Sequence, residues 1–217
     1  MSAPAERVAA IVLAAGEATR YGSQKLLTPL RGRPLLQHAI DAANASSLSP
    51  VVIVLGADAD AIAPRIEPGR ARIVRNPEYA TGQASSLRAG VRTLSSEATP
   101  DGAAAASPGS GDVTTSADAA VVLLGDQPLV TGALLDAIVA RQRETSSAAV
   151  MCLQDGRRSP PTLLHRDLFP EIEALRGDTG AREILARRDD VATLVVDRAF
   201  AGLDDIDTPT DLSRLAT

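Results

Sequence analysis

The chain has 217 residues, enough for a single domain with a substantial hydrophobic core. Its 22 Lys and Arg against 27 Asp and Glu give a net charge of −5, and aromatic residues make up only 2%, which argues against a nucleic-acid-binding protein. The single cysteine, Cys152, excludes an internal disulfide and fits a reducing cytosol. No apolar run approaches the roughly 20 residues of a membrane-spanning helix, and the N-terminus lacks the layout of a signal peptide. We therefore expect a cytoplasmic protein that binds neither membrane nor nucleic acid.

The first predicted element is a buried strand over residues 8–13, an apolar and β-branched run that ends in three small residues. Arg20, Gly22 and Lys25 follow. Small residues after a strand let backbone N–H groups approach a phosphate, and the two basic residues supply charge, so this loop is a candidate anion-binding site. The spacing is neither G-x-G-x-x-G nor a P-loop, because leucine follows Lys25. The alternative is a tight strand–helix turn with two solvated cations.

Residues 13–36, LAAGEATRYGSQKLLTPLRGRPLL, resemble the opening signature of molybdenum-cofactor-type nucleotidyltransferases, which reads LAAG, R-x-G, K-L-L and G-x-P-L-L. The chain is thereby similar to the molybdenum cofactor cytidylyltransferase family. The resemblance implies a nucleotide site lined by Leu13, Ala14, Ala15 and Gly16. It also implies that Arg20 and Lys25 hold the triphosphate and take part in catalysis.

Alternating helices and strands follow. Pro34 suits the first turn of a helix that continues to residue 43 at helical spacing. The five apolar residues Val51–Leu55 predict a strand buried on both faces, followed by a short helix at 58–67 and a strand at 71–74. This alternation predicts an α/β protein with three αβα layers and a doubly wound, mostly parallel sheet, Rossmann-like, in one domain.

Residues 76–88, NPEYATGQASSLR, read as a turn followed by serines at a helix N-terminus, where exposed N–H groups require an acceptor or an anion. They match the family pattern N-P-x-[WY]-x-x-G followed by S-[LV]-[RK]-A. The resemblance implies that Gly82, Ser85 and Ser86 face the base or ribose of the nucleotide. Ordinary helix capping by one of the serines is the alternative.

Residues 95–118 are dominated by small and polar side chains and predict a flexible insertion loop within the domain. The next buried strand, Ala119–Leu124, ends in Gly-Asp-Gln-Pro. A carboxylate at the carboxyl end of a central strand, here Asp126, lies where open α/β sheets bind ligands and suits Mg²⁺. A turn aspartate that bonds nearby N–H groups is the alternative. The resemblance identifies GD-[MQ]-P as a metal motif and implies a catalytic role for Asp126.

The second half of the chain shapes the acceptor pocket in the family. We expect a helix at 131–143 and a strand at 148–152 that buries Cys152. Residues 159–162 stand where relatives often have a Gly-x-Pro turn, and His165 is expected on the surface.

The segment that follows is predicted to start a helix. Asp178 is expected to cap this helix, which begins at Thr179 and places Arg182 in its first turn. Two interpretations of Arg182 are open: it contacts an acceptor phosphate, or it forms an exposed ion pair.

The chain closes with a predicted strand at 193–196 and the motif DDIDTPTDL at 204–212. Alternation puts Asp205 and Asp207 on the same face of an extended segment, where they repel unless a cation or a proton lies between them. Thr208 is expected to cap a final helix with Pro209 at its first position. The resemblance to the closing motif D-[IV]-D-T-P implies that both aspartates complete a metal site with Asp126, for Mg²⁺ or alternatively Mn²⁺. Acidic capping of the final helix is the other reading.

The family resemblance of these motifs implies transfer of CMP from CTP to the terminal phosphate of molybdopterin, with release of pyrophosphate. CTP is favoured over GTP because guanylyl-transferring relatives have LAGG where this chain has LAAG, with a methyl group at Ala15. A molybdenum hydroxylase is the expected recipient of the product. The alternatives are a guanylyl or sugar-phosphate nucleotidyltransferase, and a non-catalytic chaperone that carries nucleotide or cofactor.

Overall fold

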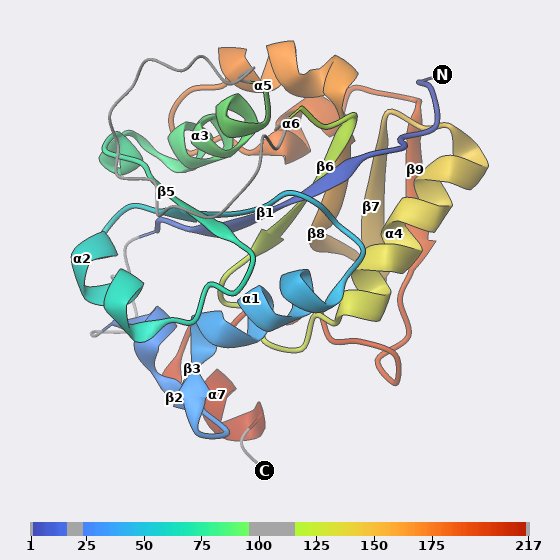
Figure 1. The fold of residues 1–217 in the computed structure, drawn as a ribbon. Coiled ribbons are helices and arrows are strands. Elements are labelled where there is room, and N and C mark those ends of the chain that lie inside the picture. Colours follow the sequence, from blue (N-terminus) through green and yellow to red (C-terminus); the bar gives the residue numbers. More distant parts are fainter. Residues whose placement is uncertain (1, 17–23, 96–115, 216–217) are drawn as a thin grey trace.

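The computed structural model describes residues 2–16, 24–95 and 116–215. Their main feature is a seven-stranded sheet in the order β5-β4-β1-β6-β8-β7-β9 (Figure 1). Its strands are β1 (Val8–Ala14), β4 (Val51–Leu55), β5 (Arg72–Arg75), β6 (Ala119–Leu124), β7 (Ala149–Gln154), β8 (Arg157–His165) and β9 (Val191–Val195). Neighbouring strands are parallel except where β8 pairs with β6 and β7, which confirms the mostly parallel sheet.

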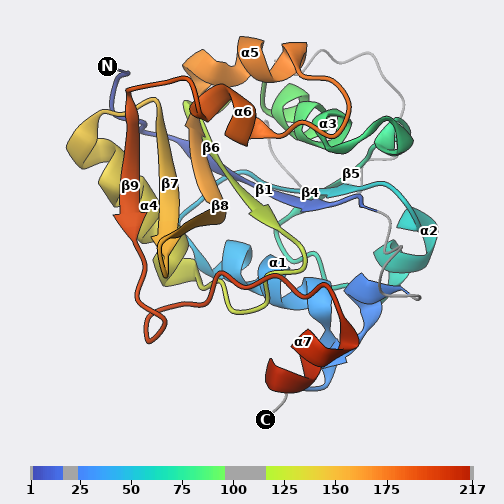
Figure 2. The ribbon, with the colours of Figure 1, turned by 180° about the vertical axis from the view of Figure 1, so that it is seen from behind.

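Helices cover both faces of the sheet, so the three-layer αβα architecture is confirmed (Figures 1 and 2). One face packs against α1 (Leu35–Ala45), α2 (Ala59–Ile62) and α4 (Gly132–Thr145). The other packs against α3 (Gln83–Ser95), α5 (Phe169–Ala174) and α6 (Ala181–Leu185). Along β1, Val12 joins the first core and Ile11 the second, which explains why this strand reads as an unbroken apolar run.

The central strands end at the same edge of the sheet. Leu13 of β1 pairs with Val54 of β4 on one side and with Leu124 of β6 on the other. Beyond the last pair, the Gly125 N–H donates to the Leu13 carbonyl at 2.9 Å. The loops that follow β1 and β6 therefore meet at the carboxyl edge, where sheets of this kind bind ligands.

Strand β8 was not expected, because its two adjacent prolines read as a turn. They are accommodated at a register shift: Met151 pairs with Thr162, whereas the next residue, Cys152, pairs with Ser159. Pro160 and Pro161 occupy the resulting bulge, where the ladder needs no N–H donor. Strand β8 therefore continues on both sides of the two prolines, which themselves do not pair with β7.

The expectation that His165 lies on the surface is wrong. His165 ends β8, pairs with Ala119, and is only 4% exposed. Its Nδ1 accepts a hydrogen bond from the Asp167 N–H at 3.3 Å and lies 3.0 Å from Oδ2 of the same residue. Its charged neighbours in sequence suggested exposure, but they follow the strand and lie outside it. The expected burial of Cys152 is confirmed, with an exposed fraction of 0%.

A small third cluster joins the segment around residues 29–35 to the C-terminal helix. The hairpin of β2 (Pro29–Leu30) and β3 (Arg33–Pro34) lies beside the final helix α7 (Pro209–Leu215) (Figure 1). Leu30, Leu35 and Ile206 form its buried centre. The expected cap of α7 is confirmed, since Thr208 Oγ1 accepts from the Asp211 N–H at 3.3 Å.

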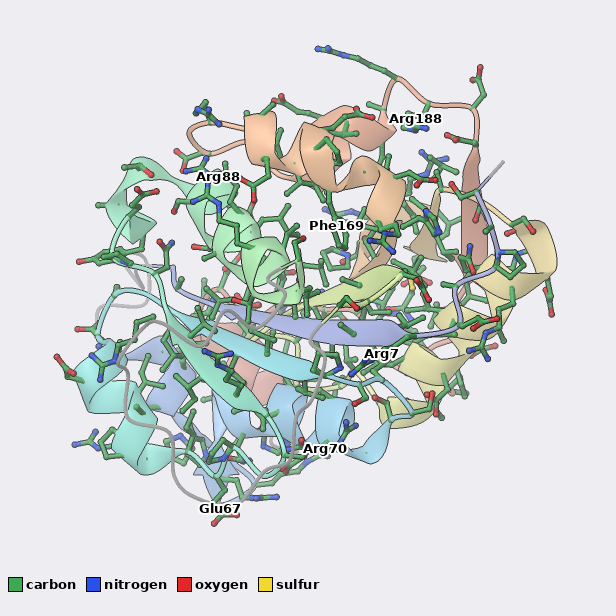
Figure 3. All side chains as sticks on the ribbon, turned by 45° about the horizontal axis from the view of Figure 1, so that its top comes forward. Arg7, Glu67, Arg70, Arg88, Phe169 and Arg188 are labelled. Atoms are coloured by element: carbon green, nitrogen blue, oxygen red, sulfur yellow. The ribbon has the colours of Figure 1, made fainter. Side chains whose placement is uncertain are left out.

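Arg70 closes the C-terminal end of α1 (labelled in Figure 3). Its guanidinium donates to the carbonyls of Ala43 at 2.9 Å, Asn44 at 3.2 Å and Ser46 at 2.8 Å. These include carbonyls that have no partner within the helix. Arg70 therefore fixes the end of α1 against the loop that leads into β4.

Most of the insertion expected at 95–118 lies outside the described residues. The described part resumes before β6, where the Asp118 N–H donates to the Arg7 carbonyl at 2.8 Å. Among the helices described, none is both long enough and apolar enough to cross a membrane.

Candidate active site

A cavity of about 420 Å³ opens at the carboxyl ends of β1 and β6. Its walls come from the end of β1 and the loop after it, the turn before α3 and the start of α3, the end of β6, and one residue of the loop before α6. The lining residues are Leu13, Ala14, Ala15, Gly16, Lys25, Leu26, Tyr79, Ala80, Gly82, Gln83, Ser86, Leu124, Gly125, Asp126 and Asp178. Except for Arg20 and Ser85, the residues predicted to bind the nucleotide thus share one cavity.

The loop after β1 places small residues against this cavity. Ala14 and Ala15 are 3% and 4% exposed, whereas a Cβ added at Gly16 would meet nothing within 4 Å. Gly56, which follows the neighbouring strand β4, has no side chain, and this leaves room for the Ala15 methyl group. A Cβ added at Gly56 would lie only 2.8 Å from the Ala15 Cβ. Arg20, predicted to hold the triphosphate, lies outside the described residues.

Lys25 is the single lysine of the sequence, and it lies between two carboxylates. Its Nζ is 2.8 Å from Asp126 Oδ2 and 3.1 Å from Asp207 Oδ1, and its side chain is 13% exposed. Burial by itself lowers the pKa of Lys25, but Asp126 and Asp207 together outweigh it and raise the pKa above its ordinary value. The ammonium group is therefore held in its charged form.

Asp126 has one oxygen without a hydrogen-bond partner among the residues that the structure describes. Its Oδ1 is buried and accepts no hydrogen bond from the described residues, although Lys25 contacts the other oxygen. Burial raises the pKa of Asp126, and the charge of Asp205 adds to that effect, while Lys25 opposes it. A buried carboxylate oxygen without a donor is a fitting ligand for a hard divalent cation.

The three predicted metal ligands are near one another but do not form a closed ligand set. Among the described residues, no group of three His, Cys, Asp or Glu is placed to hold a metal ion. Lys25 lies between Asp126 and Asp207, and the side chain of Asp207 is 52% exposed. A cation that used both aspartates would require the ammonium group to move.

Two residues that sequence reasoning missed bring the closing motif to this site. The N–H of Ile206 donates to the Asp126 carbonyl at 3.0 Å, and its side chain, 1% exposed, packs with Leu30 and Leu35. Gln127 is also buried, and its amide donates to the Leu203 carbonyl at 2.9 Å. The signal for Ile206 was an apolar residue between two aspartates, which requires a core beneath it.

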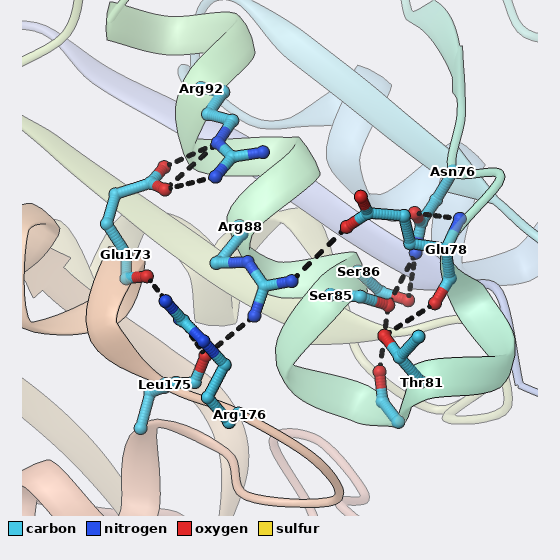
Figure 4. Close-up of polar contacts among 11 residues, drawn as sticks. Asn76, Glu78, Thr81, Ser85, Ser86, Arg88, Arg92, Glu173, Leu175 and Arg176 are labelled. Atoms are coloured by element: carbon cyan, nitrogen blue, oxygen red, sulfur yellow. Dashed lines mark hydrogen bonds and ion pairs between the residues drawn. The ribbon is translucent and has the colours of Figure 1, made fainter.

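The two serines of α3 differ in position. Ser86 lines the cavity, whereas Ser85 does not, and the Ser85 hydroxyl donates to the Gly82 carbonyl at 2.9 Å. The amide of Asn76 donates to both serine oxygens, at 2.8 Å and 3.1 Å (Figure 4). Ser85 thus closes the first turn of α3, and Ser86 is the serine available to a ligand.

The loop before α6 is fixed across the start of α3. Arg88 of α3 contacts both the Leu175 carbonyl and, at 3.3 Å, Glu78 Oε2 (Figure 4). The Ala84 N–H donates to the Gly177 carbonyl at 3.0 Å. Gly82 has φ +107°, and a Cβ added there would lie 2.3 Å from the Gly177 carbonyl carbon. The approach of the two segments therefore depends on the absence of a side chain at Gly82.

The expectation that Asp178 caps a helix is wrong. The helix α6 begins at Ala181, its N-cap is Gly180, and no side chain caps it. The carbonyl of the preceding residue, Gly177, accepts a hydrogen bond from the start of α3, and Asp178 therefore lines the cavity instead. Its sequence context resembled a cap, and only the tertiary contact with α3 places it at the site.

A second cavity, about 210 Å³, adjoins the first and shares Leu13, Gln83 and Leu124 with it. Most of its wall is apolar, from the side chains of Leu87, Val122, Met151, Leu164 and Leu185. Its charged lining residues are Arg158 of β8 and Arg182 of α6. Arg182 forms no ion pair with another described residue, and Arg158 was not anticipated from the sequence.

The arrangement can bind two ligands side by side. The first cavity has the ammonium group of Lys25 and the carboxylate of Asp126 beside the small residues that follow β1. This arrangement suits a phosphate-bearing ligand together with a metal ion. The second offers apolar walls and guanidinium groups, which suit an apolar body that carries an anion.

Comparisons with known proteins agree on the type of domain. Residues 10–191 match the sequence model of the MobA-like NTP transferase domain. The purine catabolism protein PucB of Bacillus subtilis (strain 168) is 30% identical over 210 residues, 92% of this chain and 91% of the relative. Nicotine blue oxidoreductase of Paenarthrobacter nicotinovorans is 30% identical over 215 residues, 96% of each chain.

Solved structures agree as well. The crystal structure of Rv0371c from Mycobacterium tuberculosis H37Rv has a TM-score of 0.76 and 26% identity, and 97% of each chain is covered. A complex of Rv0371c with manganese has a TM-score of 0.71 and 25% identity, with coverage of 97% of this chain and 98% of that one.

Proposed function

The chain belongs to the MobA-like NTP transferase family of nucleotidyltransferases, and from this premise we propose that it transfers CMP from CTP to the terminal phosphate of molybdopterin, with release of pyrophosphate. The observation that carries the proposal is the pair of adjoining cavities. One has the residues for a nucleotide triphosphate, and the other has apolar walls with guanidinium groups for an acceptor. Gln83 and Leu13 lie at their junction, where the two reacting phosphates would meet.

The reaction is an in-line displacement at the α-phosphorus of the nucleotide. An acceptor phosphate oxygen forms the new P–O bond as the bond to the β-phosphate oxygen breaks, and pyrophosphate leaves. Such a step requires positioning and charge neutralisation more than a protein nucleophile. In this proposal Lys25 moves from its carboxylates to the leaving pyrophosphate, and Arg20 holds the triphosphate with it.

A divalent cation, Mg²⁺ or Mn²⁺, is the proposed cofactor. When bound, it would neutralise charge on the phosphate oxygens. Asp126 would hold it through Oδ1, which has no hydrogen-bond partner in the described part of the chain, with Asp205 and Asp207 completing the site. The manganese complex of Rv0371c supports the presence of a metal in this fold.

The choice of base is proposed to depend partly on Ala15. Its methyl group narrows the cavity where a two-ring purine would need more room than cytosine. Gln83 and Ser86 also line this cavity and can offer hydrogen bonds to the base or ribose. The proposed recipient of the product is a molybdenum hydroxylase.

The test is pyrophosphate release by the purified protein with each of the four NTPs, with and without molybdopterin. We expect release with CTP only when molybdopterin and Mg²⁺ are present. The Asp126→Asn variant serves as the control, because it removes one metal ligand and should abolish release while the protein stays folded. Release that favours GTP or UTP, or that requires a sugar phosphate, would replace the proposed substrates. No release with any donor and acceptor would overturn the proposed function.

A further inference from the structure

The two aspartates proposed to complete the metal site lie in a segment without regular structure. Residues 201–207, here called the closing segment, belong to no helix or strand and run from the loop after β9 toward α7 (Figure 2). Leu203 and Ile206 are nevertheless only 4% and 1% exposed. Buried backbone groups outside a sheet or helix require other hydrogen-bond partners. These partners determine what holds Asp205 and Asp207 in place.

Two buried glutamines supply partners for the closing segment. The Leu203 N–H donates to Gln154 Oε1 at 3.0 Å, and the Leu203 carbonyl accepts from Gln127 Nε2 at 2.9 Å. Gln154 Nε2 also donates to the Ala201 carbonyl at 2.8 Å, so its carboxamide bonds the segment at two points. Gln127 and Gln154 are 1% and 6% exposed. Both backbone groups of Leu203 are therefore paired in the interior by side-chain amides.

The glutamines come from two strand ends beside the candidate active site. Gln127 lies in the loop after β6, next to Asp126, and Gln154 is the last residue of β7. The Ile206 N–H donates to the Asp126 carbonyl at 3.0 Å, and Ile206 lies between the two aspartates of the closing segment. The position of these aspartates relative to Asp126 therefore depends on the bonds at Leu203 and Ile206.

The carboxamide of Gln127 leaves one polar atom unpaired. Its Nε2 also lies 3.2 Å from the Pro160 carbonyl and 3.3 Å from Ser159 Oγ, whereas its Oε1 is buried and has no hydrogen-bond partner among the described residues. A carbonyl accepts but cannot donate, so the N–H side of the amide must face Leu203 and Pro160. A buried acceptor without a donor destabilises the folded state. The amide of Gln127 is thus oriented for the closing segment, although this leaves its own oxygen unpaired.

Another buried glutamine provides the comparison. Gln142 of α4 is 0% exposed, its Oε1 accepts from the Ala5 N–H at 2.9 Å, and its Nε2 donates to the carbonyls of Ala3 at 3.1 Å and Ser147 at 3.2 Å. Ala3 and Ala5 precede β1, so these bonds lie at the amino edge of the sheet, away from the edge that carries Asp126. Gln142 therefore has the same buried amide chemistry without a connection to the closing segment.

We propose that Gln127 and Gln154 are positioning residues for the proposed metal site, and that they fix the closing segment so that Asp205 and Asp207 are held near Asp126. The inference rests on the proposed function in assigning these aspartates to a metal ion. It adds two residues that are not themselves metal ligands and that act through the backbone of the closing segment.

The test compares metal affinity in matched methionine variants. Methionine is also unbranched but cannot donate the amide hydrogen bonds. We expect Gln127→Met and Gln154→Met each to weaken Mn²⁺ binding roughly 10- to 100-fold, the usual effect of losing a group that orients a metal ligand. Free Mn²⁺ is measured by electron paramagnetic resonance on the purified protein without nucleotide. The matched control Gln142→Met should stay within about twofold, because distant sites act independently.

Urea denaturation separates positioning from a general loss of stability. Gln142→Met removes the partner of backbone groups at Ala3, Ala5 and Ser147, whereas Gln127→Met also removes an unpaired buried oxygen. The urea midpoint should therefore fall more in Gln142→Met than in Gln127→Met, which is the reverse of the order expected for Mn²⁺ affinity. A merely structural role would give the same order in both measurements and would contradict the inference.

Hydrogen exchange followed by mass spectrometry measures the closing segment directly. Exchange in residues 201–207 should rise in Gln127→Met and Gln154→Met and stay unchanged in Gln142→Met. The two glutamine sites are tested separately, so a variant that fails to fold leaves the other to decide.

The outcomes separate this inference from the proposed function. Equal Mn²⁺ affinity in Gln127→Met and Gln142→Met would overturn it, and so would unchanged exchange in residues 201–207. A wild-type protein that binds no Mn²⁺ would overturn it together with the proposed metal site. Absence of pyrophosphate release would overturn the proposed function alone, because neither metal binding nor exchange requires a substrate.

Discussion

At the scale of single residues, Lys25 is the centre of the site. It is the single lysine among 22 basic residues, so every other basic side chain is an arginine. An ammonium group is a compact point charge on a flexible stem, whereas a guanidinium is a planar fork that favours one fixed geometry. A lysine can therefore exchange Asp126 and Asp207 for a phosphate without having to meet a fixed hydrogen-bond geometry. Its position explains why the carboxylates do not form a closed metal site in this state.

Removing this ammonium group should expose the proposed metal site. We expect Lys25→Met to tighten Mn²⁺ binding in the absence of nucleotide by about tenfold or more, because Asp126 and Asp207 lose a competing cation at 2.8 Å and 3.1 Å. The same variant should lower kcat. Free Mn²⁺ measured by electron paramagnetic resonance checks the affinity, with Arg157→Met as the control. An unchanged affinity would show that the ammonium and the metal do not compete.

Ala15 gives a second prediction. It is 4% exposed and lines the first cavity, so its methyl group is part of a packed wall. Ala15→Gly should shift the ratio of kcat/KM for CTP and GTP toward GTP without reversing it, because steric exclusion is worth a few kcal/mol at most. Steady-state pyrophosphate release with both nucleotides measures the ratio. A ratio unmoved by the substitution would remove Ala15 from base selection.

Cys152 permits a chemical test of the core. Burial raises the pKa of its thiol to about 12. Since the thiolate is the reactive form, the folded protein should react with iodoacetamide very slowly at pH 8, and the rate should rise sharply in denaturant. Mass spectrometry of the modified protein measures both rates. Fast modification of the folded protein would mean that β7 opens readily.

At the scale of elements, local sequence predicted the buried parallel strands but not the elements whose position depends on tertiary contacts. The strands β1, β4 and β6 are unbroken apolar runs, so their existence and burial followed directly. Strand β8 was missed because its pairing depends on a bulge opposite Met151 and Cys152, which only the neighbouring strand defines. The place of Asp178 was missed for the same reason, since a contact with α3 sets it.

The end of α1 gives a prediction at this scale. Arg70 donates to carbonyls of Ala43, Asn44 and Ser46, and Arg70→Ala would leave them to water. We expect a loss of about 1–2 kcal/mol in the free energy of unfolding, the usual contribution of charge-assisted bonds at a partly exposed site. Arg72→Ala, an exposed arginine at the start of β5, is the control and should change stability by less than about 0.5 kcal/mol. Equal losses in urea denaturation would contradict a specific role for Arg70.

At the scale of the whole molecule, the candidate site is assembled from both halves of the chain. The motifs at Lys25 and Asp126 could be found in sequence because each is a short pattern beside a strand end. Arg158 and Ile206 could not, because their relation to the site depends on the antiparallel course of β8 and on the core beneath the closing motif. Sequence thus predicted which residues gather at the candidate site better than how the two halves are joined.

Gly82 and Gly177 lie against each other at that junction, and they allow a test of it. Gly82→Ala places a Cβ 2.3 Å from the Gly177 carbonyl carbon, so the loop that carries Asp178 must move away from α3. We expect a loss of more than about 2 kcal/mol in the free energy of unfolding and a lower kcat/KM, because backbone atoms yield little. Gly177→Ala is the matched control: its φ is also positive, at +64°, but an added Cβ meets nothing within 4 Å. It should therefore cost only the backbone strain, about 1 kcal/mol. If both variants lose the same stability in urea and keep the same kcat/KM, strain alone explains Gly82, and the close approach of the two halves is not required for activity.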